Sequence, residues 1–172
     1  MYFLPTDEQR ELQRGVREVL DSAFPLEKLP GGFDAGLWQT LDETGVFSLR
    51  TELELGMAEA SMVFEELGRA AVPGPLVGTF LTAGVADGPV TVLDPRHTPL
   101  VVAHLAVAKS VLVLDPAGPQ LAAVPSGTGL TEPIDPLSPM HELAAVPTGT
   151  AYDAAGFSQL WQEGALLTSA LQ

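Results

Sequence analysis

Side chains that could do acid–base, nucleophilic or metal chemistry are scattered along this 172-residue chain. The three histidines, His97, His104 and His141, lack the close spacing of a metal site. The chain has no cysteine, which excludes disulfides, thiol catalysis and cysteine-bound zinc. No serine lies in the Gly-x-Ser-x-Gly context of an activated nucleophile. The sequence therefore predicts no catalytic residue.

Two adjacent carboxylates, Glu65 and Glu66, precede Arg69 in a segment with helical periodicity. Neighbouring residues of a helix point in different directions, so these two groups cannot act as a paired acid and base. We expect both to lie on a solvated helix face. Arg69 is expected to pair with a nearby carboxylate; contact with a phosphate is the alternative.

Two further patterns have structural explanations. The stretch 127–129, Gly-Thr-Gly, is too short for a dinucleotide fingerprint and opens no helix, so a plain turn is expected. His104 lies in an apolar run, which indicates a buried, hydrogen-bonded imidazole rather than a ligand.

Composition narrows the possible partners. The formal net charge of −14 argues against nucleic acid and anionic membrane surfaces, because both would repel the chain. No apolar run is long enough to span a bilayer, and the first residues do not form a secretory signal, so a cytoplasmic location is expected. With 46% hydrophobic residues, the chain has apolar surface to spare for covering a partner.

The first half of the chain has helical periodicity. Thr6 is expected to cap a helix over 7–21 and to form a capping box with Gln9. Gly15, inside this helix, would allow another helix to approach closely. A loop rich in Pro and Gly follows at 22–33. Further helices are predicted from the cap Asp34 to Gly45, from about Glu54 to Ala70, and from about Pro75 to Ala83.

The second half has short apolar runs separated by Pro and Gly. Residues 110–114 and 120–124 predict a hairpin around a turn at 115–119. Other strands are expected at 90–93, within 100–107 and at 141–146, with a loop at 125–139 and a final helix at 154–171. The predicted fold class is α+β: an N-terminal helical bundle, a small antiparallel β domain and a C-terminal helix.

Four segments, 6–12, 37–41, 45–47 and 64–69, occur in an order and spacing that resemble the acyl-CoA dehydrogenase family. The last of them reads Phe-Glu-Glu-Leu-Gly-Arg and precedes a turn that contains proline. One departure stands out. Most family members carry a Pro-Glu-x-x-Gly-Gly-x-Gly loop before the long helix, whereas the stretch 50–56 of this chain has Gly56 alone.

The resemblance implies three parts: an N-terminal helical domain over 1–86, a shortened middle β domain over 87–150, and the start of a truncated C-terminal helical domain over 151–172. In the family, the catalytic base comes from the C-terminal domain, which is largely absent here. The stretch 130–133, Leu-Thr-Glu-Pro, resembles the flavin-binding strand end of the middle domain, so Thr131 is the one candidate FAD contact. The glycine and serine that normally follow this strand end are missing.

The function implied by the resemblance is that of a degenerate or truncated subunit of a flavin-dependent acyl-CoA dehydrogenase, an oxidoreductase of lipid metabolism. Such a chain would catalyse acyl-CoA oxidation only with a partner subunit, as a homo- or hetero-oligomer. FAD would be bound with that partner, or its binding would be lost. Two alternatives remain: a non-catalytic scaffold protein derived from the same fold, and a fragment of a full dehydrogenase.

Overall fold

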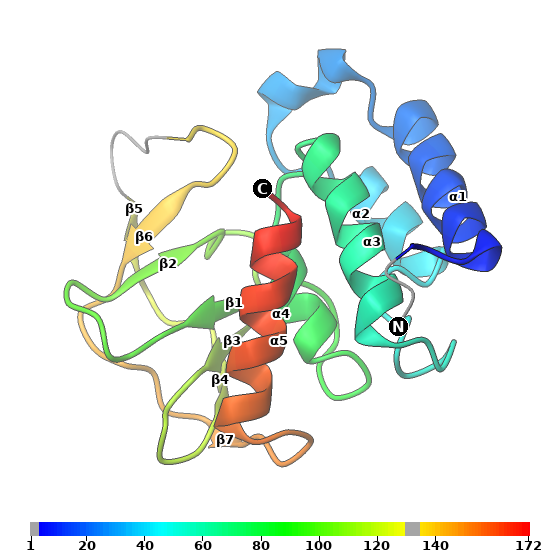
Figure 1. Ribbon diagram of the computed structural model, residues 1–172. Helices are drawn as coiled ribbons and strands as arrows, with labels where there is room; N and C mark the ends of the chain where they lie inside the picture. Colours follow the sequence, from blue (N-terminus) through cyan, green and yellow to red (C-terminus); the bar gives the residue numbers. More distant parts are fainter. Residues whose placement is uncertain (1–3, 130–134) are drawn as a thin grey trace. The chain divides into compact units, whose positions relative to one another are not determined.

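The computed structural model describes residues 4–129 and 135–172 (Figure 1). The chain divides into two compact units. The helical unit comprises Met1–Val72 and Leu166–Gln172, and the strand unit comprises Pro73–Ala165. The predicted α+β class is confirmed. No helix in the described part of the chain is both long and apolar enough to cross a bilayer.

Apart from the end of the final helix, the described residues of the helical unit form three α-helices and one short 3-10 helix: α1 (Asp7–Ala23), η1 (Leu26–Gly31), α2 (Ala35–Glu43) and α3 (Met57–Arg69). The Thr6–Gln9 capping box is present at the start of α1, as predicted. Asp34 caps α2 by accepting hydrogen bonds from two backbone amides. The 3-10 helix η1 occupies part of the stretch for which only a loop was predicted.

Helix α3 begins at Met57, three residues after the predicted start. Glu54 has a positive φ of 53°, which a continuing right-handed helix does not tolerate. Gly56 is the N-cap, and its amide donates to Oε2 of Glu59 at 3.0 Å. The stretch 50–56 therefore ends as the N-cap of a helix.

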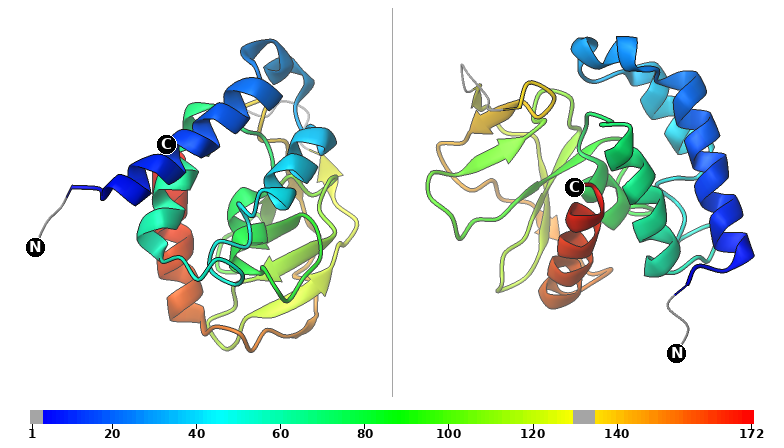
Figure 2. Two further views of the ribbon diagram at one scale, coloured as in Figure 1. Left: turned by 90° about the vertical axis from the view of Figure 1, so that its right-hand side faces the viewer. Right: turned by 45° about the horizontal axis from the view of Figure 1, so that its top comes forward.

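The core of the helical unit forms where α1 packs along α3 (Figure 2). Trp38 of α2 adds an aromatic stack, with ring centroids 5.2 Å from Phe33 and 4.6 Å from Phe47. The described hydrophobic residues of this unit with no exposed surface are Leu20, Leu41, Ala60, Val63, Phe64, Leu67 and Leu167.

The described strands of the strand unit form two small sheets (Figure 1). The first has the order β1-β3-β4-β7 and the second β2-β6-β5. Their bounds are β1 (Val90–Leu93), β2 (Val101–Ala103), β3 (Ser110–Val113), β4 (Gln120–Ala123), β5 (Thr128–Gly129), β6 (Met140–Glu142) and β7 (Thr150–Ala151). The predicted hairpin is confirmed, with Leu112 of β3 opposite Leu121 of β4.

Three details differ from the strand predictions. First, β1 and β3 pair in parallel, because the chain leaves the first sheet, contributes β2 to the second and then returns. Second, residues 128–129 form β5, paired with β6, where a plain turn was expected. Third, β2 ends before His104, whose positive φ of 56° breaks the extended backbone.

Helix α4 (Leu76–Leu81) covers β1. A side chain at Gly78 would collide with the carbonyl oxygen of Val90, so only glycine permits this close approach. The hydroxyl of Thr79 accepts a hydrogen bond from the Val90 amide at 2.9 Å. The final helix, α5 (Phe157–Ala170), starts within the strand unit, and its residues from Leu166 onward belong to the helical unit.

Candidate functional site

The predicted flavin contact, Thr131, lies outside the described residues, as does the rest of 130–134. The structure describes the residues on either side of this segment: β5 ends at Gly129, and the chain continues from Asp135. Gly129 lies opposite His141 in the pairing of β5 with β6. The residues around these flanks, which include His104, form the candidate site, called here the histidine corner.

Packing restricts the strand that leads to this corner. A Cβ at Gly127 would lie 2.6 Å from Cδ2 of Leu105 and 3.1 Å from Cδ2 of Leu143, which is too close for any other residue without movement. A Cβ at Gly129 would lie 3.9 Å from the ring of His141, an ordinary contact. A larger residue at position 127 would therefore need the Leu105 and Leu143 side chains to move, whereas one at position 129 would not.

The two histidines of the corner differ in burial, since His104 is buried and His141 is half-buried. His104 is 7% exposed, and its backbone amide donates to the Pro139 carbonyl at 2.8 Å. Burial lowers the pKa of His104, nearby His141 lowers it further, and Asp135 opposes the shift. His104 is therefore neutral at neutral pH, and its predicted burial is confirmed. Nδ1 of His141 is buried without a hydrogen-bond partner in the described structure.

The carboxylate of the corner stabilises a turn. Asp135 accepts hydrogen bonds from the Leu137 amide at 2.9 Å and from the Ser138 hydroxyl at 2.7 Å. These bonds lower the pKa of Asp135, so it stays ionised and is a weak base. The described side chains of the corner can offer hydrogen bonds to a polar ligand.

FAD carries an anionic pyrophosphate, so the formal charge of the strand unit bears on whether this unit could bind it. Between residues 73 and 165 the sequence has eight acidic and two basic side chains, a formal balance of −6. The two cations are Arg96 and Lys109. Arg96 already donates to both oxygens of Asp94, at 2.8 and 2.7 Å. The unit is thus poor in cations for a pyrophosphate, which backbone amides or another chain would have to hold.

The carboxylate pair of α3 corrects a prediction. Glu65 is exposed as expected, but Glu66 is 1% exposed and does not lie on a solvated face. Its Oε2 accepts from Nε of Arg17 at 2.9 Å and from Nε of Arg69 at 2.7 Å. The hydrogen bond from Arg17, and to a smaller extent that from Arg69, holds the pKa of Glu66 below its usual value. The predicted pairing of Arg69 with a carboxylate is confirmed, and Arg69 also reaches Asp21.

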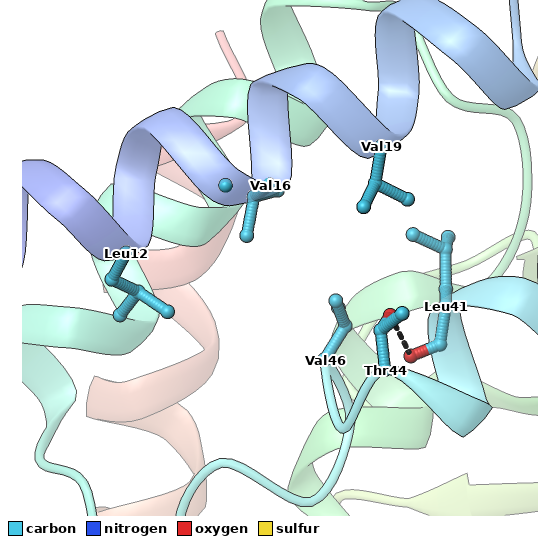
Figure 3. Close-up of a pocket in the computed structure, with 7 residues that line it drawn as sticks. Leu12, Val16, Val19, Leu41, Thr44 and Val46 are labelled. Carbon is cyan, nitrogen blue, oxygen red and sulfur yellow. Dashed lines mark hydrogen bonds between the residues drawn. The ribbon is translucent and has the colours of Figure 1, made fainter.

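A pocket of about 270 Å³ lies between α1 and the residues around the end of α2 (Figure 3). Its lining is Leu12, Gly15, Val16, Val19, Leu41, Thr44 and Val46. The hydroxyl of Thr44 already donates to the backbone carbonyls of Thr40 and Leu41. No titratable side chain lines this pocket, so it could accept an apolar group but could not catalyse proton transfer.

The predicted close helix approach at Gly15 is wrong, because a Cβ there would have nothing within 4 Å.

No family model matches the chain. Two curated proteins do, both named acyl-CoA dehydrogenase IpdE2. The one from Mycobacterium tuberculosis is 45% identical over 56 residues, which are 29% of this chain and 18% of that protein. The one from Mycolicibacterium smegmatis is 43% identical over 80 residues, which are 43% of this chain and 24% of that protein.

The fold matches solved acyl-CoA dehydrogenase structures over nearly the whole chain. A variant of the Tcur3481-Tcur3483 steroid ACAD has a TM-score of 0.69 at 19% identity and covers 96% of this chain. The ChsE4-ChsE5 complex of Mycobacterium tuberculosis has a TM-score of 0.65 at 18% identity and covers 99%. The chain thus resembles the acyl-CoA dehydrogenase family, in sequence over part of its length and in fold over nearly all of it.

The similarity spans only part of each relative. The chain covers 62% and 64% of the two solved family members, and the alignments to the curated members span smaller shares. At these identities the solved structures show a shared fold alone. The family typically binds FAD, and the strand unit of this chain has a formal charge of −6.

Proposed function

We propose that this acyl-CoA dehydrogenase-like chain is a non-catalytic subunit of a two-chain, flavin-dependent acyl-CoA dehydrogenase. In this proposal the partner supplies the catalytic base and most of the FAD site, and acyl-CoA binds to the assembly. The charge balance of −6 in the strand unit, with Arg96 already bonded to Asp94, is the observation that carries the proposal.

The state of the carboxylates supports a partner-supplied base. A general base works best with a pKa near the operating pH, which for a carboxylate requires an upward shift. Every described carboxylate with a resolved shift has its pKa lowered instead, because hydrogen bonds stabilise the ionised form. These are Asp34, Glu59, Glu66, Asp94 and Asp135.

The solved relatives support the two-chain form of the proposal. Both are named as pairs of chains, Tcur3481-Tcur3483 and ChsE4-ChsE5. The structural alignment with each of them includes nearly the whole of this chain. By this likeness, we propose a hetero-oligomer whose other chain is also an acyl-CoA dehydrogenase family member.

Flavin absorption tests the proposal directly. The chain would be purified alone and after co-expression with each acyl-CoA dehydrogenase family chain of its own genome. We expect a colourless protein alone, and flavin colour with acyl-CoA oxidation in one mixture that neither chain shows separately. Stoichiometric FAD on the isolated chain would contradict the proposal.

The scaffold alternative predicts a different result from the same experiment. The mixture would then form a complex, but its flavin content and acyl-CoA turnover would equal those of the partner alone. Titrating the partner with this chain while both quantities are measured distinguishes the two functions.

A further inference from the structure

An arginine lies over two aromatic rings at the start of α5. The guanidinium carbon of Arg96 is 4.3 Å from the ring centroid of Trp161 and 5.2 Å from that of Phe157. The two rings are one helical turn apart and nearly parallel, with centroids 6.1 Å apart and planes at 21°. Trp161 nevertheless remains 41% exposed. We call these three residues the aromatic clamp.

Asp94 fixes the arginine of the clamp. Its two carboxylate oxygens accept hydrogen bonds from Nε and Nη2 of Arg96, and Oδ1 also accepts from the Arg96 amide at 3.0 Å. Nη1 of Arg96 has no acceptor among residues 4–129 and 135–172. Because the guanidinium is already held, little side-chain entropy is left to lose on binding.

The helix that carries the clamp is unusually poor in charge. The 14 residues of α5 include one charged side chain, Glu163. The 17 residues of α1 include eight: two Asp, three Glu and three Arg. Depletion of charge, with enrichment of Trp, Phe and Arg, distinguishes the centre of protein–protein interfaces from ordinary surface.

We propose that the aromatic clamp is the docking surface for the partner subunit, an inference that rests on the proposed function. The partner presents an apolar patch to the Trp161 and Phe157 rings and a carbonyl or carboxylate oxygen to Nη1 of Arg96. Its surrounding surface is basic, since this chain has a net charge of −14. The same charge disfavours a second copy of this chain, because two such copies repel each other.

The experiment uses the full chain labelled with fluorotryptophan, and each family chain of the same genome as the unlabelled partner. The two tryptophans give two fluorine resonances, and buried Trp38 serves as an internal reference. Addition of the right partner should shift or broaden the Trp161 resonance and leave the Trp38 resonance unchanged. Equal shifts of both, or a shift of Trp38 alone, would overturn the assignment.

Variants give a second readout by affinity. Trp161→Ala should weaken partner binding by roughly thirty-fold or more, as expected for a central aromatic anchor. Arg96→Lys should weaken it less, since it keeps the charge but loses the planar stack. Val85→Ala, at a 54% exposed residue of the same unit, is the matched control and should change nothing.

The outcomes separate this inference from the proposed function. If a partner binds Trp161→Ala as tightly as the natural chain, the docking surface lies elsewhere and the two-chain proposal stands. If no family chain binds, both proposals fail. If the natural chain self-associates and Trp161→Ala abolishes that association, the occupant is a second copy and the partner assignment is wrong.

Discussion

Arg17 of α1 and Glu66 of α3, 49 residues apart, form a two-point ion pair through Nε and Nη2 of the arginine. Arg69 holds the same carboxylate from one turn further along α3. The carboxylate is buried, whereas the side chains of Arg17 and Arg69 are 49% and 42% exposed. One buried charge is thus satisfied by two arginines that extend from solvent, and it joins the two helices.

Removing this carboxylate should destabilise the chain. Glu66→Ala leaves a small cavity and separates the two arginines from their shared partner. We expect a loss of about 2 kcal/mol in the free energy of unfolding, less than for a fully buried pair because both guanidinium groups are partly screened by water. Glu65→Ala, at the exposed neighbour, should stay within about 0.5 kcal/mol. Urea unfolding measures both, and equal effects would contradict this account of Glu66.

Acid should weaken the strand unit through Asp94. Arg96 lowers the pKa of Asp94 from 3.8 to about 2. A carboxyl group with a lowered pKa stabilises the fold above its unfolded-state pKa, and that contribution is lost as the pH falls through the folded-state value. The stabilisation, about 1 to 2 kcal/mol after allowance for the exposed arginine, should therefore disappear between these two pH values.

Asp94→Asn tests this pH dependence. The variant should be less stable than the natural chain near neutral pH, and the difference should shrink as the pH falls from 3.8 towards 2. Chemical unfolding followed across this range gives the comparison. A difference in stability that stays constant with pH would show that the ionisation of Asp94 does not contribute.

Two glycines of the helical unit should respond to alanine in opposite directions. A Cβ at Gly15 has free space around it, so Gly15→Ala should stabilise α1 by about 1 kcal/mol through helix propensity. A Cβ at Gly68 would collide with the backbone of Leu171, so Gly68→Ala should destabilise despite its better propensity. Thermal unfolding of both variants checks the prediction, which fails if the two shifts have the same sign.

The hydroxyl of Tyr152 should matter for the strand unit. It is buried and donates to the carbonyl of Leu81, the last residue of α4, at 2.7 Å. Tyr152→Phe keeps the ring and leaves this carbonyl short of a donor, which should cost about 1 to 2 kcal/mol. Urea unfolding measures the loss. Stability equal to that of the natural chain would mean that water replaces the hydroxyl.

Local chemistry was predicted well from the sequence. The Thr6–Gln9 box, the Asp34 cap and the hairpin over 110–124 each depend on residues within a few positions of one another, and all three are present. The parallel pairing of β1 with β3 depends on where the chain goes between them. No period or turn residue in the sequence encodes that route.

Sites made by distant residues were harder to predict. The sequence does contain a signal for the burial of Glu66: it lies three residues after Val63 and therefore on the inner face of α3. Its partner Arg17 belongs to another helix, and nothing local links the two. The aromatic clamp has the same character, since Arg96 and Trp161 meet only once the strand unit has folded.

The two compact units differ in whether each is formed by one continuous segment of the chain. The strand unit is one uninterrupted stretch, Pro73–Ala165, whose end falls within α5. The helical unit is not, because its last seven residues return from the far end of the polypeptide. Stopping translation at Val72 would leave Gly68 without the Leu171 backbone beside it, so an isolated helical unit would need that terminal peptide added back or fused through a new linker.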